Sequence, residues 1–309
     1  MSPEEIESRF ASLNVWRRDG ARAPHKPLLV LWMLGRWQAG KCGPVPFDEV
    51  DAAVGDLLRD HLPADRVARP ELPFWHLQND GVWMLDGGVT QRPPGKVGSA
   101  PPKGVLKDGV SGHFAPAVAA AFEADADMVR RVAQSLVVSH FPASLRADVL
   151  TSLGLPANWG ATAPEVEDDA DVDDPRAALF RPSVLIAYRY RCAVCGFNVR
   201  LGTRPVAIDA AHIRWRQAGG EHAVTNGIAM CALHHRLFDA GAFTLSTAQP
   251  ESDSRVLLSE LVVGDGEAAD RLIALHGRPL TPPQRDEDRP TAEHLDWHRS
   301  EVFRGRPLP

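Results

Sequence analysis

Three of the four cysteines stand in two short motifs that could hold a metal ion. Cys192 and Cys195 are separated by two residues, and Cys231 and His234 repeat that spacing further along the chain. Each pair lets one tight turn present two ligands, and two such pairs complete the tetrahedral shell of Zn²⁺. The sequence therefore predicts a structural zinc site, and Cys42 is left outside it.

The segment between and after these pairs holds residues that suit phosphodiester hydrolysis. His212, Asn226 and His235 follow one another along it. A neutral histidine near pH 7 can take a proton from water, and a cation stabilises the charge that develops on phosphate oxygens. Neighbouring helix residues point about 100° apart, so His234 can face the zinc while His235 faces a second site.

In this order, and in register with the cysteine pairs, these residues resemble the HNH endonucleases of the ββα-metal fold, in the subgroup with a Cys/Cys/Cys/His zinc site. The resemblance covers about residues 179–245. It implies that His212 is the general base and that Asn226 braces the loop and orients this base. It also implies that His235 binds the catalytic ion, which would be Mg²⁺ or another divalent ion such as Mn²⁺.

The second ligand of that ion stays open. Many members of the family carry Asp or His immediately before the base, where this chain has Ala211. Asp239 lies one helical turn beyond His235 and has the better spacing, and Asp209 is the other candidate. Three arginines flank the motif and are expected to hold phosphates: Arg214, Arg216 and Arg236.

The net charge of −6 is unevenly distributed and does not exclude nucleic acid as a partner. Seven acids and no base lie between residues 165 and 174, whereas residues 179–240 carry eight arginines against three acids. The acidic run lacks periodicity and repels itself, which indicates an extended linker. The basic stretch suits contact with phosphates.

The first half of the chain has mostly helical periodicity. Apolar spacing predicts helices near residues 6–13, 28–37, 47–58, 115–124 and 127–141. Two apolar runs, 74–77 and 81–85, flank an Asn-Asp-Gly sequence and predict a β-hairpin. The breaker-rich stretch 91–112, with its lysines, predicts a mobile basic loop.

We therefore expect an α+β protein of two domains. Residues 1–160 form a mainly helical domain, and residues 161–178 form the acidic linker. Residues 179–309 form a ββα-metal (HNH) domain with structural zinc, followed by a helical trailer that includes residues 275–279 and 295–303. No apolar run approaches the length of a membrane span and no secretion signal is indicated, so a cytoplasmic protein is expected.

Several segments of the first domain, which include residues 25–29, 69–77, 79–81 and 139–145, resemble a known DNA reader. As a set they resemble the sulfur-binding domain of phosphorothioate-dependent type IV restriction enzymes, the McrA-like group with a C-terminal HNH domain. The resemblance spans about residues 9–155. It implies that the domain recognises DNA in which sulfur replaces a non-bridging phosphate oxygen.

Such a reader needs an apolar pocket, because an oxygen left there without a donor would cost about 1–3 kcal/mol. Pro142 is expected to touch sulfur, together with Phe141 and Ala143 or Leu145. Phe141 stands where the family has tyrosine, and Leu77 and Gln78 stand where it has an arginine. Phosphate and base contacts are expected from His25, Lys26, Arg69, His76 and Gln78.

The sequence thus predicts a modification-dependent endonuclease that binds phosphorothioated double-stranded DNA and cuts nearby. A palindromic target would favour a homodimer by symmetry, although no dimerisation stripe is visible. Two alternatives stay open. One is a non-catalytic DNA-binding protein stapled by zinc, in which Ala211 reflects lost activity. The other is an HNH nuclease that reads another mark, such as methylated cytosine.

Overall fold

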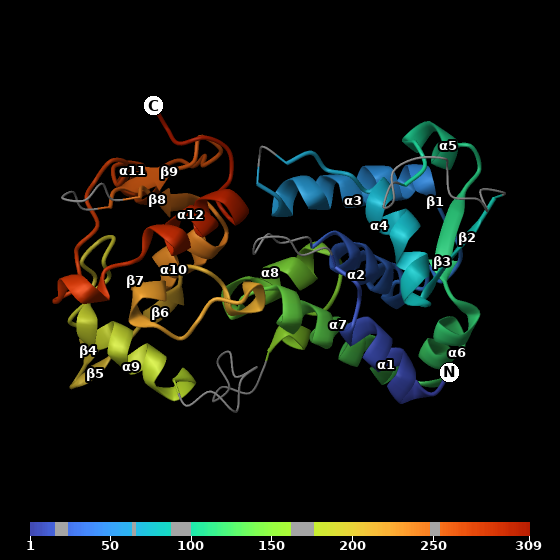
Figure 1. Cartoon of the computed structure of the whole chain (residues 1–309), viewed down its shortest axis with the longest axis horizontal. Helices are drawn as coiled ribbons and strands as arrows, with labels where there is room; N and C mark the ends of the chain where they lie inside the picture. The colour runs from blue at the N-terminus through green and yellow to red at the C-terminus, as the bar shows by residue number, and fades with distance from the viewer. Residues whose placement is uncertain (16–23, 64–65, 88–99, 162–175, 248–253) are drawn as a thin grey trace. The chain divides into compact units, whose positions relative to one another are not determined.

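The computed structural model describes residues 1–15, 24–63, 66–87, 100–161, 176–247 and 254–309 (Figure 1). The chain divides into two compact units, of which the first covers Met1–Leu62 and Arg66–Thr162 and the second covers Ala163–Pro309. The acidic run predicted as a linker, residues 165–174, lies outside the described residues. In the described ranges no helix is long and apolar enough to cross a membrane.

The first unit is mainly helical, as predicted, and its core lies between the helices. In α3 the buried residues Phe47, Val50, Val54 and Leu58 follow the helical period, so that one face turns inward. The α-helices are α1 (Pro3–Ala11), α2 (His25–Gln38), α3 (Phe47–His61), α4 (Glu71–His76), α5 (Lys103–Lys107), α6 (Pro116–Ala124), α7 (Ala126–His140) and α8 (Ala143–Ser152). A 3₁₀ helix, η2 (Ala157–Gly160), follows α8.

A small antiparallel sheet in the order β1-β3-β2 lies at one end of this unit, beside α5 (Figure 1). Its strands are β1 (Val45–Pro46), β2 (Trp83–Asp86) and β3 (Ser111–Phe114). The hairpin predicted from residues 74–77 and 81–85 is wrong. Phe74 belongs to α4, a 3₁₀ helix η1 (Leu77–Asp80) follows, and β2 pairs with the distant β3.

The physical reason is that Gly81 ends the 3₁₀ helix instead of turning a hairpin. Its φ of 72° is the left-handed conformation that glycine adopts readily at a helix end. The basic loop predicted over 91–112 is also wrong in the part that is described. Lys103 and Lys107 lie in α5, and both pair with Asp51 at 2.6 and 2.9 Å.

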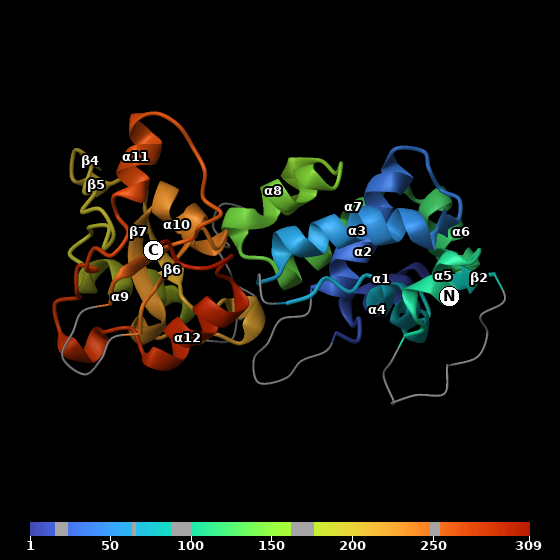
Figure 2. The same cartoon turned by 90° about the horizontal axis from the view of Figure 1, so that it is seen from above.

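The second unit is built on two antiparallel strands and a helix. Strands β6 (Ile208–His212) and β7 (Gly227–Cys231) pair in the register Ile208↔Cys231, and α10 (Ala232–Asp239) follows β7 directly. All five residues of β7 are buried because α9 (Ala177–Ala187) and α10 both pack against it (Figures 1 and 2). This β-β-α order is the predicted ββα-metal arrangement.

The remaining elements surround that centre. A two-stranded hairpin, β4 (Arg200–Leu201) with β5 (Arg204–Pro205), precedes β6. Strands β8 (Phe243–Leu245) and β9 (Val256–Leu258) pair after α10, followed by α11 (Glu267–Ile273) and α12 (Ala292–Glu301). The predicted helical trailer is present as α12, whereas residues 275–279 are not helical, and Pro279 forms an isolated bridge with Arg255. Short 3₁₀ turns lie at η3 (Arg216–Ala218), η4 (Val224–Asn226) and η5 (Asp286–Asp288).

Candidate functional site

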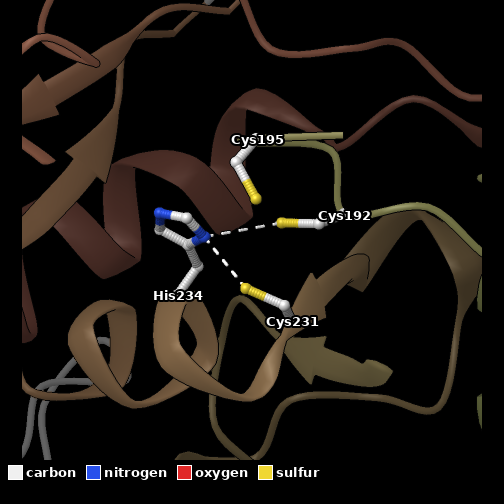
Figure 3. Close-up of side chains that lie close together, drawn as sticks. All are labelled: Cys192, Cys195, Cys231 and His234. Atoms are coloured by element: carbon white, nitrogen blue, oxygen red, sulfur yellow. Dashed lines mark hydrogen bonds between the residues drawn. The ribbon is translucent and has the colours of Figure 1, made fainter. Parts of the chain in front are cut away.

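The predicted zinc ligands come together in the second unit (Figure 3). Cys192 and Cys195 lie on the turn after α9, Cys231 ends β7, and His234 lies in the first turn of α10. All four ligand atoms lie within 4.8 Å of one another, and Nδ1 of His234 is 3.1 and 3.7 Å from the sulfurs of Cys231 and Cys192. Tetrahedral Zn–S bonds of about 2.3 Å would separate two sulfurs by about 3.8 Å, so the group fits zinc.

His212 ends β6 and lies between two aromatic neighbours. Its ring stacks on Phe180 of α9 at a centroid distance of 3.8 Å, and its Nε2 lies 3.4 Å from Nδ1 of His222. Burial, and after it the neighbouring His222 and Arg216, holds the pKa of His212 well below its ordinary value. His212 is therefore neutral near pH 7 and able to accept a proton.

Asn226 braces the loop between β6 and β7. It is fully buried, its Oδ1 accepts from the backbone N–H of Arg214 at 2.8 Å, and its Nδ2 donates to the carbonyls of Arg214 and Glu221. Gly220 lies in the same loop, and a Cβ there would lie 1.9 Å from the Arg214 carbonyl oxygen. This loop carries His222 and begins directly after His212, so the brace holds both histidines in place.

His235 lies between two carboxylates. Its Nε2 is 3.2 Å from Oδ2 of Asp239, which is 2% exposed, and its Nδ1 is 3.7 Å from Oδ2 of Asp209. Burial alone would lower the pKa of His235, but Asp239 and Asp209 outweigh it and raise the pKa to about 10. A divalent ion that bound this ring would replace its proton, and the carboxylates would offset the charge of the ion.

Two of the three arginines expected to hold phosphates are occupied within the protein. Arg214 donates through Nε to the carbonyl of Ala218 at 3.1 Å, and its Nη1 lies 3.5 Å from Glu293. Arg216 donates to the carbonyl of Gly220. Both guanidinium groups thus stabilise the loop that Asn226 braces. Arg236 lies on α10 and is exposed.

In the first unit, one group of predicted DNA contacts lies near the start of α2. His25 lies close to Arg66, Arg69 and Glu71, and its burial, followed by the charge of Arg66, lowers its pKa to about 4. Arg69 is 57% exposed and pairs with Glu71 at 2.9 Å. This group presents arginine side chains beside a neutral histidine, which suits contact with a phosphate.

Lys26 has a different environment from the exposed one expected of a DNA contact. It is 8% exposed, and its ammonium lies 2.6 Å from Oδ2 of Asp80, whose Oδ1 accepts from the backbone N–H of Asn14. Lys26 therefore ties α2 to η1 and offers no free ammonium to DNA. Gln78 is also engaged, since its Nε2 donates to the Trp75 carbonyl, and His76 ends α4 half-buried.

The predicted sulfur-contacting residues lie at the junction of α7 and α8. Phe141 is 1% exposed, Pro142 is buried, Leu145 is half-buried and Ala143 is exposed. The buried Arg146 donates through Nε to the Phe141 carbonyl at 3.0 Å, which holds this turn against α8. His61, at the end of α3, approaches the Phe141 ring edge-on at 5.7 Å.

The comparisons with known proteins agree with both halves of this description. A family model described as the ScoMcrA-like DNA sulfur-binding domain matches residues 3–158, which is half of the chain. The chain belongs to this family. A second model, described as HNH endonuclease, matches residues 192–246. The first unit is thus a sulfur-binding domain and the second an HNH domain, as the sequence predicted. No curated protein matches the chain.

Solved structures are similar to parts of this chain at low identity. The sulfur-binding domain of SprMcrA complexed with phosphorothioated DNA is 23% identical, with a TM-score of 0.42, and the match covers 50% of this chain and 95% of that one. The corresponding ScoMcrA domain is 22% identical, with a TM-score of 0.43, over 48% and 95%. The modification-dependent TagI restriction endonuclease is 24% identical, with a TM-score of 0.30, over 42% and 39%.

Sequence reasoning missed some neighbours of the sites in both domains. In the HNH domain His222 and Phe180 contact His212, although neither stands at a spacing that marks a ligand or a catalytic residue. In the sulfur-binding domain His61 contacts Phe141 from a helix that lies 80 residues earlier in the chain. Neither the His-Ala-Val-Thr-Asn sequence of the loop nor a histidine at a helix end marks these contacts in the sequence. Tertiary packing alone brings His222 to His212 and His61 to Phe141.

Proposed function

We propose that this protein is a modification-dependent endonuclease that recognises phosphorothioated DNA through its sulfur-binding domain and cuts nearby phosphodiester bonds with its HNH domain. The observation that carries the proposal is the presence of both family matches on one chain, over residues 3–158 and 192–246. The family description, a DNA sulfur-binding domain, suggests sulfur in DNA as the mark that is read. Tethering raises the local concentration of the cutting domain where the reader is bound.

In the proposed reaction His212 is the general base. If it donates its Nε2–H to Nδ1 of His222, 3.4 Å away, its lone pair stays on Nδ1 and can accept a proton from water. The resulting hydroxide would attack phosphorus as the bond to the leaving oxygen breaks, and that oxygen would take up a proton from solvent water. A divalent ion, when bound, would stabilise the charge that develops on the phosphate oxygens.

The geometry around His235 favours different roles for the two carboxylates. Asp239 is buried and accepts from Nε2, the arrangement in which a carboxylate orients a histidine ligand. Asp209 is 37% exposed on the Nδ1 side, so it can share an ion with His235. We therefore assign Asp209 as the ligand and Asp239 as the positioning residue. Asp209→Asn should then weaken Mn²⁺ binding more than Asp239→Asn, and the reverse order would exchange the two roles.

The proposed reader uses the α7–α8 junction for sulfur. The half-buried Leu145 offers apolar surface there beside the buried Pro142, and a larger and more polarisable sulfur would be favoured in such a place over an oxygen that would lack a donor. Arg69, His25 and His76 are proposed to contact the surrounding phosphates and bases. Lys26 is left out of this set because its ammonium is paired with Asp80.

Substitution of the proposed base tests the nuclease assignment. His212→Ala should lower the rate of Mn²⁺-dependent cleavage of a phosphorothioated duplex by about 10²- to 10⁴-fold and leave DNA binding in place. Glu267 lies exposed on α11, so Glu267→Gln is the control and should cut like the unaltered protein. Undiminished cleavage by His212→Ala would remove the assignment. Absence of cleavage by the unaltered protein would favour the non-catalytic alternative.

A further inference from the structure

The stretch between the start of α9 and β6 is strongly basic, and most of its arginines take no part in the site described above. Residues 177–208 contain five arginines and no Asp or Glu. One of them, Arg181, donates to the Ile208 carbonyl and lies 4.0 Å from Asp209. The other four are exposed, and none forms a salt bridge within the described part of the chain: Arg189, Arg191, Arg200 and Arg204.

Two of these arginines belong to the β4–β5 hairpin. The hairpin pairs Leu201 with Arg204 and Arg200 with Pro205, so Arg200 and Arg204 lie on opposite faces. Leu201, next to the turn, is 76% exposed. The hairpin therefore presents an apolar side chain near its tip with one cation on each face.

The other two arginines lie on the turn after α9, beside the hairpin. Arg189 and Tyr190 both have a φ of 55°, a conformation that residues other than glycine rarely adopt. Their backbone N–H groups donate to Ile186 and Leu185 at 2.9 and 2.7 Å, which holds the turn. The Arg200 guanidinium lies 5.7 Å from the centre of the Tyr190 ring and links turn and hairpin. Because the zinc ligand Cys192 follows directly, the arginines are borne on a rigid support.

We propose that these four arginines and Leu201, here called the arginine hairpin surface, are the DNA-docking surface of the HNH domain. The inference rests on the proposed nuclease function, and its partner is duplex DNA. Four exposed guanidinium groups that form no salt bridge with the described residues complement the phosphates, and a two-stranded ribbon fits the major groove, where Leu201 would face base edges. Arg214 and Arg216 cannot take this role, because their guanidinium groups already bond loop carbonyls.

The position of the hairpin suits this role. Arg204 precedes Asp209 by five residues, so their Cα atoms lie at most about 18 Å apart. A duplex carries one negative charge per roughly 1.7 Å of its axis, so several phosphates lie within that span. One duplex can therefore contact the hairpin and the proposed catalytic residues at the same time. The surface would hold unmodified backbone on either side of the cut, whereas the sulfur-binding domain supplies selectivity.

The test uses the full chain with His212→Ala, so that DNA is bound but not cut. The variant combines Arg189→Gln, Arg200→Gln and Arg204→Gln, and its affinity for an unmodified duplex is measured over a range of salt concentrations. We expect binding at least about tenfold weaker at low salt, and a slope of log K against log salt smaller by about 0.9 for each phosphate that is no longer neutralised. The ratio of affinities for phosphorothioated and unmodified duplexes should stay unchanged.

The matched control removes three exposed arginines elsewhere in the same domain: Arg271→Gln, Arg278→Gln and Arg306→Gln. In Figure 1 the hairpin lies on one side of β7. Helix α11, which carries Arg271, lies on the opposite side of β7. The control should bind like the parent, and both variants should keep one zinc ion per chain. An unchanged affinity and slope in the hairpin variant, or an equal loss in the control, would overturn the proposal.

Two further outcomes separate this inference from related ones. A larger loss of affinity for an RNA duplex than for DNA would assign the surface to RNA and overturn the proposal. Failure of the proposed nuclease function would give a different result from failure of this inference. In that case the protein without substitutions would cut no DNA, whether or not the hairpin binds it. Leu201→Glu places an acid among the phosphates and should weaken binding, whereas Leu201→Ala should leave the salt slope unchanged.

Discussion

His212 is held between the Phe180 ring and the imidazole of His222. The stacked ring limits rotation of His212, and the contact with His222 favours one tautomer. Two histidines this close would repel each other if both were protonated, and this repulsion contributes to the lowered pKa of His212. The His-Asn-His order alone predicted His212 as the base, whereas the proposed orienting residue, His222, is brought to it by packing of the loop.

We expect His222→Ala to lower kcat for cleavage of phosphorothioated DNA about tenfold and to leave KM nearly unchanged, because the loss affects orientation of the base and not DNA binding. His222→Asn places an amide near the position of Nδ1 and should recover part of kcat. Steady-state kinetics on one duplex measure both values. A change confined to KM, or no rescue by asparagine, would argue for a structural role only.

At the scale of elements, local spacing predicted what short segments determine by themselves. The pairs Cys192/Cys195 and Cys231/His234 each fit within one turn, so their spacing predicted the ligand group that the fold assembles. The neighbouring histidines of α10 diverge as helix geometry requires, and His235 meets Asp209 and Asp239. The helical period also predicted the main helices of the sulfur-binding domain.

Spacing could not predict contacts that depend on distant segments. The runs around Asn79-Asp80-Gly81 have the composition of a hairpin, but β2 pairs with β3, which follows 25 residues later in the chain. Asp80 instead forms a salt bridge with the ammonium group of the buried Lys26. A lysine in a Lys-Pro sequence at a helix start looks the same in the sequence whether it contacts DNA or a carboxylate. Only its surroundings in the fold show which partner it has.

The Cys192, Cys195, Cys231 and His234 cluster, proposed to hold zinc, joins the turn after α9 to the junction of β7 and α10, so removal of the ion should loosen these three segments. We expect a strong chelator to lower the thermal midpoint of the HNH domain and to abolish cleavage, because the free energy of metal binding contributes to folding of the segments that the ion would join. Added Mg²⁺ alone should not restore cleavage, whereas Zn²⁺ followed by Mg²⁺ should. Full cleavage by a chain shown to lack zinc would contradict a structural role for this group.

Helix α12 is joined to α10 by His298. This histidine is fully buried, its Nε2 lies 3.1 Å from the Phe238 carbonyl, its Nδ1 lies 2.9 Å from Oγ1 of Thr244, and its ring stacks on Phe238 at 3.6 Å. Burial lowers its pKa to about 4. The trailer thus packs against both α10 and β8.

The stability of the HNH domain should therefore depend on pH. Between pH 6.5 and 4 the unfolded chain binds a proton at His298 that the folded chain does not, so the contribution is complete above pH 6.5 and is lost as the pH falls toward 4. The loss should reach about 3 kcal/mol. Urea unfolding at several pH values should show it, and His298→Gln should remove this part of the pH dependence. An equal pH dependence in both proteins would contradict this explanation.

At the scale of the whole molecule, the proposed function assigns different tasks to the two domains. The sulfur-binding domain is nearly neutral, whereas residues 179–240 carry a net charge of +5. A basic cutting domain alone would bind any DNA, so selectivity has to come from the reader and from the tether. The acidic run between them is expected from its charge to stay away from DNA.

Selective reading is expected to depend on Pro142. Pro142→Ala removes apolar surface from the proposed pocket, so the preference for sulfur should fall several-fold while the total affinity for DNA changes less. Pro156→Ala, an exposed proline of the same domain, is the matched control. Binding of phosphorothioated and unmodified duplexes gives the preference, and thermal unfolding checks that α8 still folds. Equal losses for both duplexes would remove Pro142 from the pocket.

The most direct test of the central claim is a competition between phosphorothioated, methylated and unmodified duplexes of one sequence at one salt concentration. The full chain with His212→Ala is used so that binding is measured without cleavage. An oxygen without a donor costs about 1–3 kcal/mol, so the phosphorothioated duplex should bind roughly 5- to 150-fold more tightly than the other two. Equal affinity for sulfur-containing and unmodified DNA, or a preference for the methylated duplex, would contradict the account.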